Sequence, residues 1–186
     1  SEQVEKIHPQ ALFKNHQALL HYISIHLKNT LLTLYQTLHT HNTELHEPQA
    51  IGRRSLKNIC LSYLAQAHTE GIELAYQQFK EARFMTDRLT ALVILINGDN
   101  ISLRDQALSE FYERFKNQPH GVDQWFLVQA NAHKQDTLAR VQKLMDHPAF
   151  NIKNPNKVSN LAVAFSQNIV AFHDDQGLGY EFLTQL

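Results

Sequence analysis

The stretch Ser55-Leu56-Lys57-Asn58-Ile59-Cys60-Leu61-Ser62-Tyr63-Leu64-Ala65-Gln66-Ala67 decides the fold class. Apolar side chains recur in it at intervals of three and four residues: Leu56, Ile59, Cys60, Tyr63, Leu64 and Ala67. This spacing places them on one face of an α-helix. A half-buried strand would instead alternate apolar and polar residues, and no convincing alternation of that kind is found along the chain. The sequence therefore predicts an all-α protein.

The same periodicity recurs along the 186 residues and predicts a series of helices. Their expected ranges are 9–22, 24–40, 49–67, 70–81, 86–97, 103–117, 120–131, 136–146, 155–167 and 178–186. Pro9, Pro48, Pro119 and Pro155 lie at predicted starts, where a missing N–H costs little. The polar residues 40–47 are the clearest predicted loop.

Side chains that can accept a backbone N–H mark some of the predicted helix starts. Asn154 is the expected N-cap before Pro155, and Ser102 and Asp136 are expected to cap their helices. Gly98 follows an apolar helix and is expected to stop it.

Helices of similar length with short links pack as antiparallel neighbours. Helix pairs recur loosely, roughly every 30–40 residues, which favours stacked helical hairpins in an α-solenoid of HEAT or armadillo type. Because no strict sequence repeat is found, a compact helical bundle is the alternative. We expect residues 1–186 to form a single helical-repeat domain.

Composition excludes several classes of function. The formal net charge is −1, from 17 basic and 18 acidic side chains, which gives no electrostatic footprint for nucleic acid or an anionic membrane. No apolar run reaches the ~18 residues of a membrane span. The single cysteine, Cys60, cannot form an intramolecular disulfide and favours a reducing compartment, so we expect a cytoplasmic protein. Cys60 lies on an apolar stripe, which is typical of a core residue.

The sequence carries no recognisable catalytic motif. H-E-x-x-H, the nucleophile elbow and the glycine-rich phosphate loops are all missing. His41, Glu44, His46 and Glu47 cluster in the predicted loop, where spacing does not fix metal geometry. A small helical metal protein that uses the N-terminal histidines is a minor alternative. Arg53, Arg54 and Lys57 form a basic cluster that we interpret as a solvated helix face rather than an anion site. An interaction or scaffold role follows.

Several blocks of sequence resemble those of one enzyme family. They are residues 51–61 (R-R-x-L-K-N-x-C-L), 85–92 (M-T-D-R-L-x-A-L), 123–130 (D-x-W-F-x-x-Q-A), 147–156 (H-P-x-F…N-P-N) and 171–183 (A-F-H…G-x-G-Y-x-F-L). In this order they resemble the bacterial aminopeptidase N family of M1 zinc aminopeptidases. The resemblance covers about residues 50–186, and the first 50 residues are less distinctive.

The resemblance implies a non-catalytic segment of a larger enzyme. In that family a C-terminal helical superhelix closes over the active site and limits substrate access. The catalytic unit is a separate domain, with zinc bound by H-E-x-x-H and G-A-M-E-N for the substrate amine. Neither motif is present here, so we expect no catalytic residue, metal ligand or cofactor in this chain, which would be truncated at both ends. The implied partners are the catalytic domain of the same polypeptide and a peptide substrate.

One block departs from the family pattern at residues of possible functional importance. The family often reads N-P-N-R-x-R, with arginines that face the substrate cavity, whereas here Lys157 and Ser159 follow Asn156. Lysine keeps the charge but loses the planar fork of arginine, and serine loses the charge. Asn156, Lys157 and Ser159 are the candidate substrate-channel residues, although a plain helix start explains this run more simply. A stand-alone helical-repeat scaffold that binds a protein or peptide is the alternative function.

Overall fold

The computed structural model describes residues 8–40, 48–174 and 176–185, and within them it contains helices and no strand. The helices are α1 (Pro9–His26), α2 (Lys28–Thr40), α3 (Pro48–Leu64), α4 (Thr69–Glu81), α5 (Met85–Asn97), α6 (Ile101–Phe115), α7 (Pro119–Ala130), α8 (Thr137–Met145), α9 (Pro155–Val158), the π-helix η1 (Ser159–Val163), α10 (Ala164–Ser166) and α11 (Leu178–Thr184). The predicted all-α class is confirmed. The predicted loop residues 41–47 lie outside the described residues.

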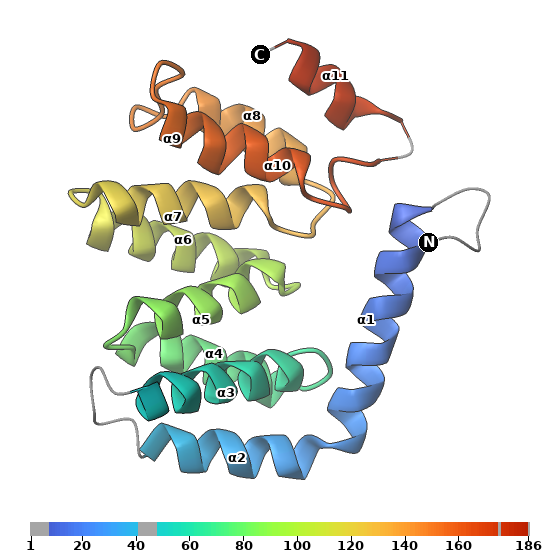
Figure 1. Cartoon of the computed structure of the whole chain (residues 1–186), viewed down its shortest axis with the longest axis vertical. Helices are drawn as coiled ribbons and strands as arrows, with labels where there is room; N and C mark the ends of the chain where they lie inside the picture. The colour runs from blue at the N-terminus through green and yellow to red at the C-terminus, as the bar shows by residue number, and fades with distance from the viewer. Residues whose placement is uncertain (1–7, 41–47, 175, 186) are drawn as a thin grey trace. The chain divides into compact units, whose positions relative to one another are not determined.

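The chain divides into two compact units, and each has its own core. One unit spans His16–Ala107, and in it α2 packs on α3 and α4 packs on α5, with α3 also against α4 and α5. The other contains residues 1–15 and 108–186, and in it α7 packs against α8, η1 and α10. Figure 1 shows the helices within each unit stacked as successive hairpins, as the sequence predicts.

The two cores are built from apolar residues at helical spacing. In the unit His16–Ala107 they include Tyr35, Cys60, Leu61, Leu64, Phe79, Leu92, Leu95 and Ile96. In the other unit they include Phe111, Trp125, Phe126, Val141, Leu161 and Phe165. Cys60 is buried as predicted, and burial raises the pKa of its thiol above the usual value, so it behaves as a small apolar residue.

The predicted apolar face of α3 is partly wrong. Cys60 and Leu64 are buried, but Leu56 is 43% exposed and Ile59 is 52% exposed. The helix instead turns Lys57 and Leu61 into the core. The physical reason is that Lys57 pairs with the buried carboxylate of Asp87 on a neighbouring helix. The apolar periodicity of α3 carries no information about this partner.

The four prolines expected at helix starts each begin a helix, but only one of the three predicted caps, Asn154, makes its hydrogen bond. Asn154 Oδ1 accepts the N–H of Asn156 ahead of Pro155. The prediction of Ser102 as an N-cap is wrong, because α6 already begins at Ile101 and Asn100 Oδ1 accepts the N–H of Leu103 at 3.0 Å. Asp136 does precede α8, but its side chain makes no cap hydrogen bond and pairs with Arg140. Among the described residues, no helix combines the length and apolar character that crossing a bilayer requires.

Candidate functional site

The candidate substrate-channel residues lie at the start of α9. Asn154 caps this helix, and the side chains of Asn156 and Ser159 are exposed. Lys157, in contrast, points toward a neighbouring helix.

Lys157 forms a half-buried ion pair with Asp123 of α7. Its Nζ donates to Asp123 Oδ1 at 2.6 Å, and the two side chains are only 12% and 17% exposed. The ammonium also lies 5.5 Å from the centre of the Phe126 ring, within cation–π range. Lys157 therefore links α9 to α7, which the sequence did not predict.

A π-helical turn follows directly. In η1 the N–H of Ala164 reaches back to the carbonyl of Ser159, and the turn buries Leu161 and Ala162 while Val163 stays exposed. Such turns are rare in proteins, and those that occur are often found at functional sites. The sequence around Ser159 contains no signal for it, because the apolar periodicity of the predicted helix 155–167 continues through the turn.

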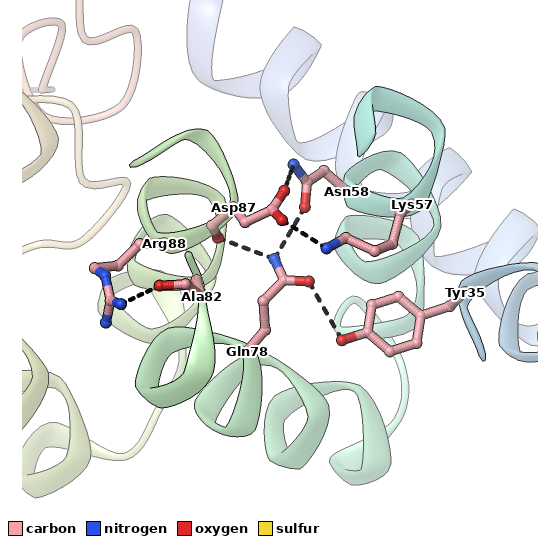
Figure 2. A network of polar contacts seen from close by, with 7 residues as sticks. All are labelled: Tyr35, Lys57, Asn58, Gln78, Ala82, Asp87 and Arg88. Carbon is pink, nitrogen blue, oxygen red and sulfur yellow. Dashed lines mark hydrogen bonds and ion pairs between the residues drawn. The ribbon is translucent and has the colours of Figure 1, made fainter. Parts of the chain in front are cut away.

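Two of the family-like blocks meet in a buried polar network between α3, α4 and α5. Figure 2 shows its centre, where Lys57 Nζ donates to Asp87 Oδ2 at 2.7 Å and Asn58 Nδ2 donates to Asp87 Oδ1 at 2.9 Å. The side chains of Lys57 and Asp87 are 2% and 3% exposed. Both carboxylate oxygens of Asp87 are thus satisfied by α3, which lets a charged pair persist in the core.

The network continues through Gln78 of α4. Its Nε2 donates to Asn58 Oδ1 and to the carbonyl of Asp87, both at 2.9 Å, and its Oε1 accepts the hydroxyl of Tyr35 at 3.3 Å. Burial, followed by the negative charges of Asp87 and Glu81, raises the pKa of Tyr35 to about 12. The phenol therefore stays protonated and acts as a donor.

The residue after Asp87 holds the end of α4. Arg88 donates to the backbone carbonyls of Phe79 and Ala82, which lie at the C-terminal end of α4. Figure 2 shows the contact with Ala82. A cation at a helix C-terminus satisfies carbonyls that have no partner within the helix. In the block M-T-D-R, Asp87 thus contacts α3 and Arg88 contacts the end of α4. This part of the family resemblance therefore reflects helix packing.

The predicted solvated basic cluster on α3 is wrong for one of its members. Lys57 is buried in the network, while Arg53 is exposed and the guanidinium of Arg54 lies 4.1 Å from the centre of the Phe84 ring. Three charges that the sequence places on one turn have three different environments, and they do not form an anion site.

His147, from the block H-P-x-F, lies among aromatic rings. Its ring centre is 5.0 Å from that of Tyr112, 5.0 Å from that of Trp125 and 6.0 Å from that of Phe126. Its Nδ1 accepts the N–H of Ala149 at 3.1 Å, which is possible for the neutral ring. Burial lowers the pKa of His147 below the usual value.

Metal ligands do not gather in the part of the chain that the structure describes. No group of three or more His, Cys, Asp or Glu side chains there could hold a metal ion. The cluster His41, Glu44, His46 and Glu47 lies outside the described residues, so the minor alternative of a histidine metal site stays a prediction.

A family described as a domain of unknown function (DUF3458_C) with ARM repeats matches residues 1–186. The chain belongs to this family. Its ARM repeats agree with the stacked hairpins of the structure and confirm the predicted α-solenoid class.

The curated relatives are aminopeptidases, as the blocks predict. Aminopeptidase N of Haemophilus influenzae is 32% identical over 187 residues, and that of Escherichia coli is 31% identical over 188 residues. Each comparison covers 100% of this chain and 21% of the relative. The chain therefore spans about a fifth of the length of these relatives.

A solved structure agrees with the sequence comparison. The crystal structure of Legionella pneumophila aminopeptidase A in complex with aspartic acid superposes with a TM-score of 0.88 at 32% identity. The match covers 99% of this chain and 23% of that one. The predicted resemblance to a helical domain of bacterial aminopeptidase N is confirmed.

Proposed function

We propose that this chain is the non-catalytic helical domain of an M1-type zinc aminopeptidase, an enzyme that removes N-terminal residues from peptides. The observation that carries the proposal is the match of the whole chain to about 21% of aminopeptidase N relatives. The sequence lacks H-E-x-x-H and G-A-M-E-N, so zinc and the groups that bind the substrate amine would belong to another part of the polypeptide. A cytoplasmic location is part of the proposal and rests on the single cysteine.

The domain's proposed role is to close over the active site and limit substrate access. The polar network around Asp87 supports this role, because a satisfied network makes helix packing specific and rigid, as a chamber wall requires. The near-neutral charge also suits a wall that meets peptides of varied sequence. Lys157 already neutralises Asp123, so among the candidate channel residues Asn156 and Ser159 have side chains free to face a substrate.

The catalytic part of the proposal is tested by comparing the 186-residue chain with the longer polypeptide that contains it. With added zinc and alanyl-4-nitroanilide as substrate, we expect the longer polypeptide to release nitroaniline and the chain to release none above the protein-free rate. Zinc-dependent hydrolysis by the purified chain would overturn the proposal, as would an inactive and folded longer polypeptide.

The access role needs a second measurement. Protease sites placed before Ser1 and after Leu186 in the longer polypeptide would allow the domain to be cut out after folding and then removed. We expect removal to raise kcat/KM for a folded protein with an alanyl N-terminus relative to kcat/KM for alanyl-4-nitroanilide. An unchanged ratio would leave the domain with a purely structural role.

A further inference from the structure

The unit that contains residues 108–186 has a pocket of about 760 Å³. Its walls come from the α8 region, from α11 with the segment before it, and from the first turns of α1. This volume falls within the ~300–1,000 Å³ typical of ligand sites. Asn156, Lys157 and Ser159 do not line it, so it is separate from the candidate channel residues.

Glutamine side chains dominate the polar lining of the pocket. Gln135 and Gln142 lie on the α8 side, and Gln176 and Gln185 lie on the α11 side. Gln10 connects α1 to the segment before α11, because its Nε2 donates to the carbonyl of His173 at 2.9 Å. Its Oε1 can accept a hydrogen bond from a ligand. A carboxamide both donates and accepts hydrogen bonds, which is the pattern that a peptide backbone offers in return.

Apolar side chains line the pocket between these carboxamides. Phe13, Leu138 and Val170 are only half-buried there, and Phe182 is buried and forms part of the same wall. Half-buried apolar groups in a concave site gain free energy when a ligand side chain removes them from water. The mixture of apolar and amide groups suits a ligand with an amide backbone and apolar side chains.

The charges of the pocket narrow the class of ligand. Among the described residues that line it, Asp174 and Glu181 carry carboxylates and Lys134 carries an ammonium. Asp174 Oδ1 accepts the N–H of Leu178 at 2.9 Å, while the side chain of Glu181 is exposed. Together these two carboxylates and one ammonium have a net negative charge, which disfavours phosphate groups and acidic peptides. A metal ion would need more ligands, and the described residues bring no such set together.

We propose that this pocket binds an extended peptide segment that is uncharged or basic, with its backbone paired to the glutamines and its apolar side chains against Phe13, Leu138 and Val170. Glu181 selects a basic side chain over an acidic one. The inference does not depend on the proposed aminopeptidase role, since either a domain of an enzyme or a stand-alone scaffold can contain such a site.

The test uses three probes that differ at one position: acetyl-Ala-Leu-Lys-Leu-Ala-amide and its counterparts with Gln or Glu in place of Lys. Each is titrated into the 186-residue chain by isothermal calorimetry at low salt. We expect saturable binding, with the lysine peptide the tightest and the glutamate peptide at least about fivefold weaker, the effect of one partly screened charge pair.

Two substitutions link binding to the pocket. Ala139→Trp fills it from α8 and is expected to weaken the lysine peptide at least about tenfold, whereas Ala11→Trp, at an exposed residue of α1 outside the lining, is not. Glu181→Lys is expected to reverse the order of the lysine and glutamate peptides, and Glu73→Lys on α4 is the matched control. Circular dichroism checks that each variant is folded.

Each outcome decides the inference. Reversal by Glu181→Lys with loss in Ala139→Trp supports it. Absence of saturable binding by all three peptides overturns it. Binding that is unchanged by both substitutions also overturns it, as does tighter binding of the glutamate peptide to the unsubstituted chain. The nitroanilide assay is a separate readout, so failure here leaves the proposed enzyme role standing.

Discussion

At the scale of single residues, Lys57 and Asp87 form an ion pair whose side chains are both almost fully buried. Removing two charges from water is costly, and their attraction offsets this only when the remaining polar atoms are satisfied. Here Asn58 and Gln78 supply those partners. The pair therefore favours one register of α3 against α5 and α4.

Asp87→Ala is expected to lower the free energy of unfolding by about 3–5 kcal/mol, because it leaves the Lys57 ammonium buried and unpaired. Urea unfolding followed by circular dichroism measures the loss. Glu113→Ala, which breaks the exposed pair with Lys116, is the control and is expected to leave the midpoint of urea unfolding nearly unchanged, because water screens this pair.

The double variant with Lys57→Met and Asp87→Leu separates charge from packing. Because an apolar pair of similar size leaves no buried charge, it is expected to recover most of the stability lost in Asp87→Ala. If Asp87→Ala alone is as stable as the unsubstituted chain, the Lys57 ammonium must reach solvent, and the network is then not rigid.

His147 gives the stability of its unit a dependence on pH. Burial lowers the pKa of the native ring, while the unfolded ring titrates near 6.5. Below about 6.5 the unfolded chain therefore binds a proton that the native chain does not, and stability falls as pH falls toward the native pKa. Protonation would also end the acceptance of the Ala149 N–H by Nδ1.

His147→Asn is expected to flatten the decrease in melting temperature between pH 7 and pH 5.5. Asparagine keeps an acceptor near the Ala149 N–H but does not titrate. Thermal unfolding at several pH values measures the slope, and His16→Asn, at an exposed histidine of α1, is the control. An equal slope in the unsubstituted chain and in His147→Asn would contradict the role of His147.

At the scale of helices, a glycine sets how closely α4 approaches the end of α3. A Cβ on Gly71 would lie 2.5 Å from the Ala65 nitrogen and 2.5 Å from the Leu64 carbonyl carbon. Both are backbone atoms, so the helices would have to move apart. Gly52 in α3, in contrast, has no atom within 4 Å of the equivalent position.

The two glycines are therefore expected to respond to alanine with opposite signs. Gly71→Ala is expected to destabilise the chain by roughly 1–3 kcal/mol through the forced shift. Gly52→Ala is expected to stabilise it by roughly 0.5–1 kcal/mol, because alanine favours the helix and restricts the unfolded chain. Urea unfolding of both variants measures the difference, and equal effects would contradict the close packing.

Helices were the most predictable level of this structure. Proline at N1 and an apolar stripe are local signals, and they located α3, α7 and the cap at Asn154 within a few residues. The exposed side of α3 was not predictable, because burial of Lys57 depends on Asp87, which lies 30 residues away. The π-turn at Ser159 and the pairing of Lys157 with Asp123 likewise arise from packing between helices and leave no local pattern.

At the scale of the whole molecule, a chain of stacked hairpins is expected to distribute stability locally. In repeat proteins each element contacts mainly its sequence neighbours, so a defect affects the adjacent helices most. This chain fits that description, because its contacts group into the unit His16–Ala107 and the unit with residues 108–186. Each unit buries its own apolar side chains, such as Ile96 in one and Val141 in the other.

Mild core substitutions in the two units are therefore expected to have reciprocal effects on amide hydrogen exchange. Ile96→Val removes one buried carbon atom and is expected to cost about 1 kcal/mol locally, and Val141→Ala removes two and is expected to cost about 2 kcal/mol. Ile96→Val should reduce protection mainly in α3, α4 and α5, and Val141→Ala mainly in α7, α8 and α10. Uniform loss of protection from either substitution would mean that the chain unfolds as one cooperative unit, because a local defect would then lower the stability of every helix equally.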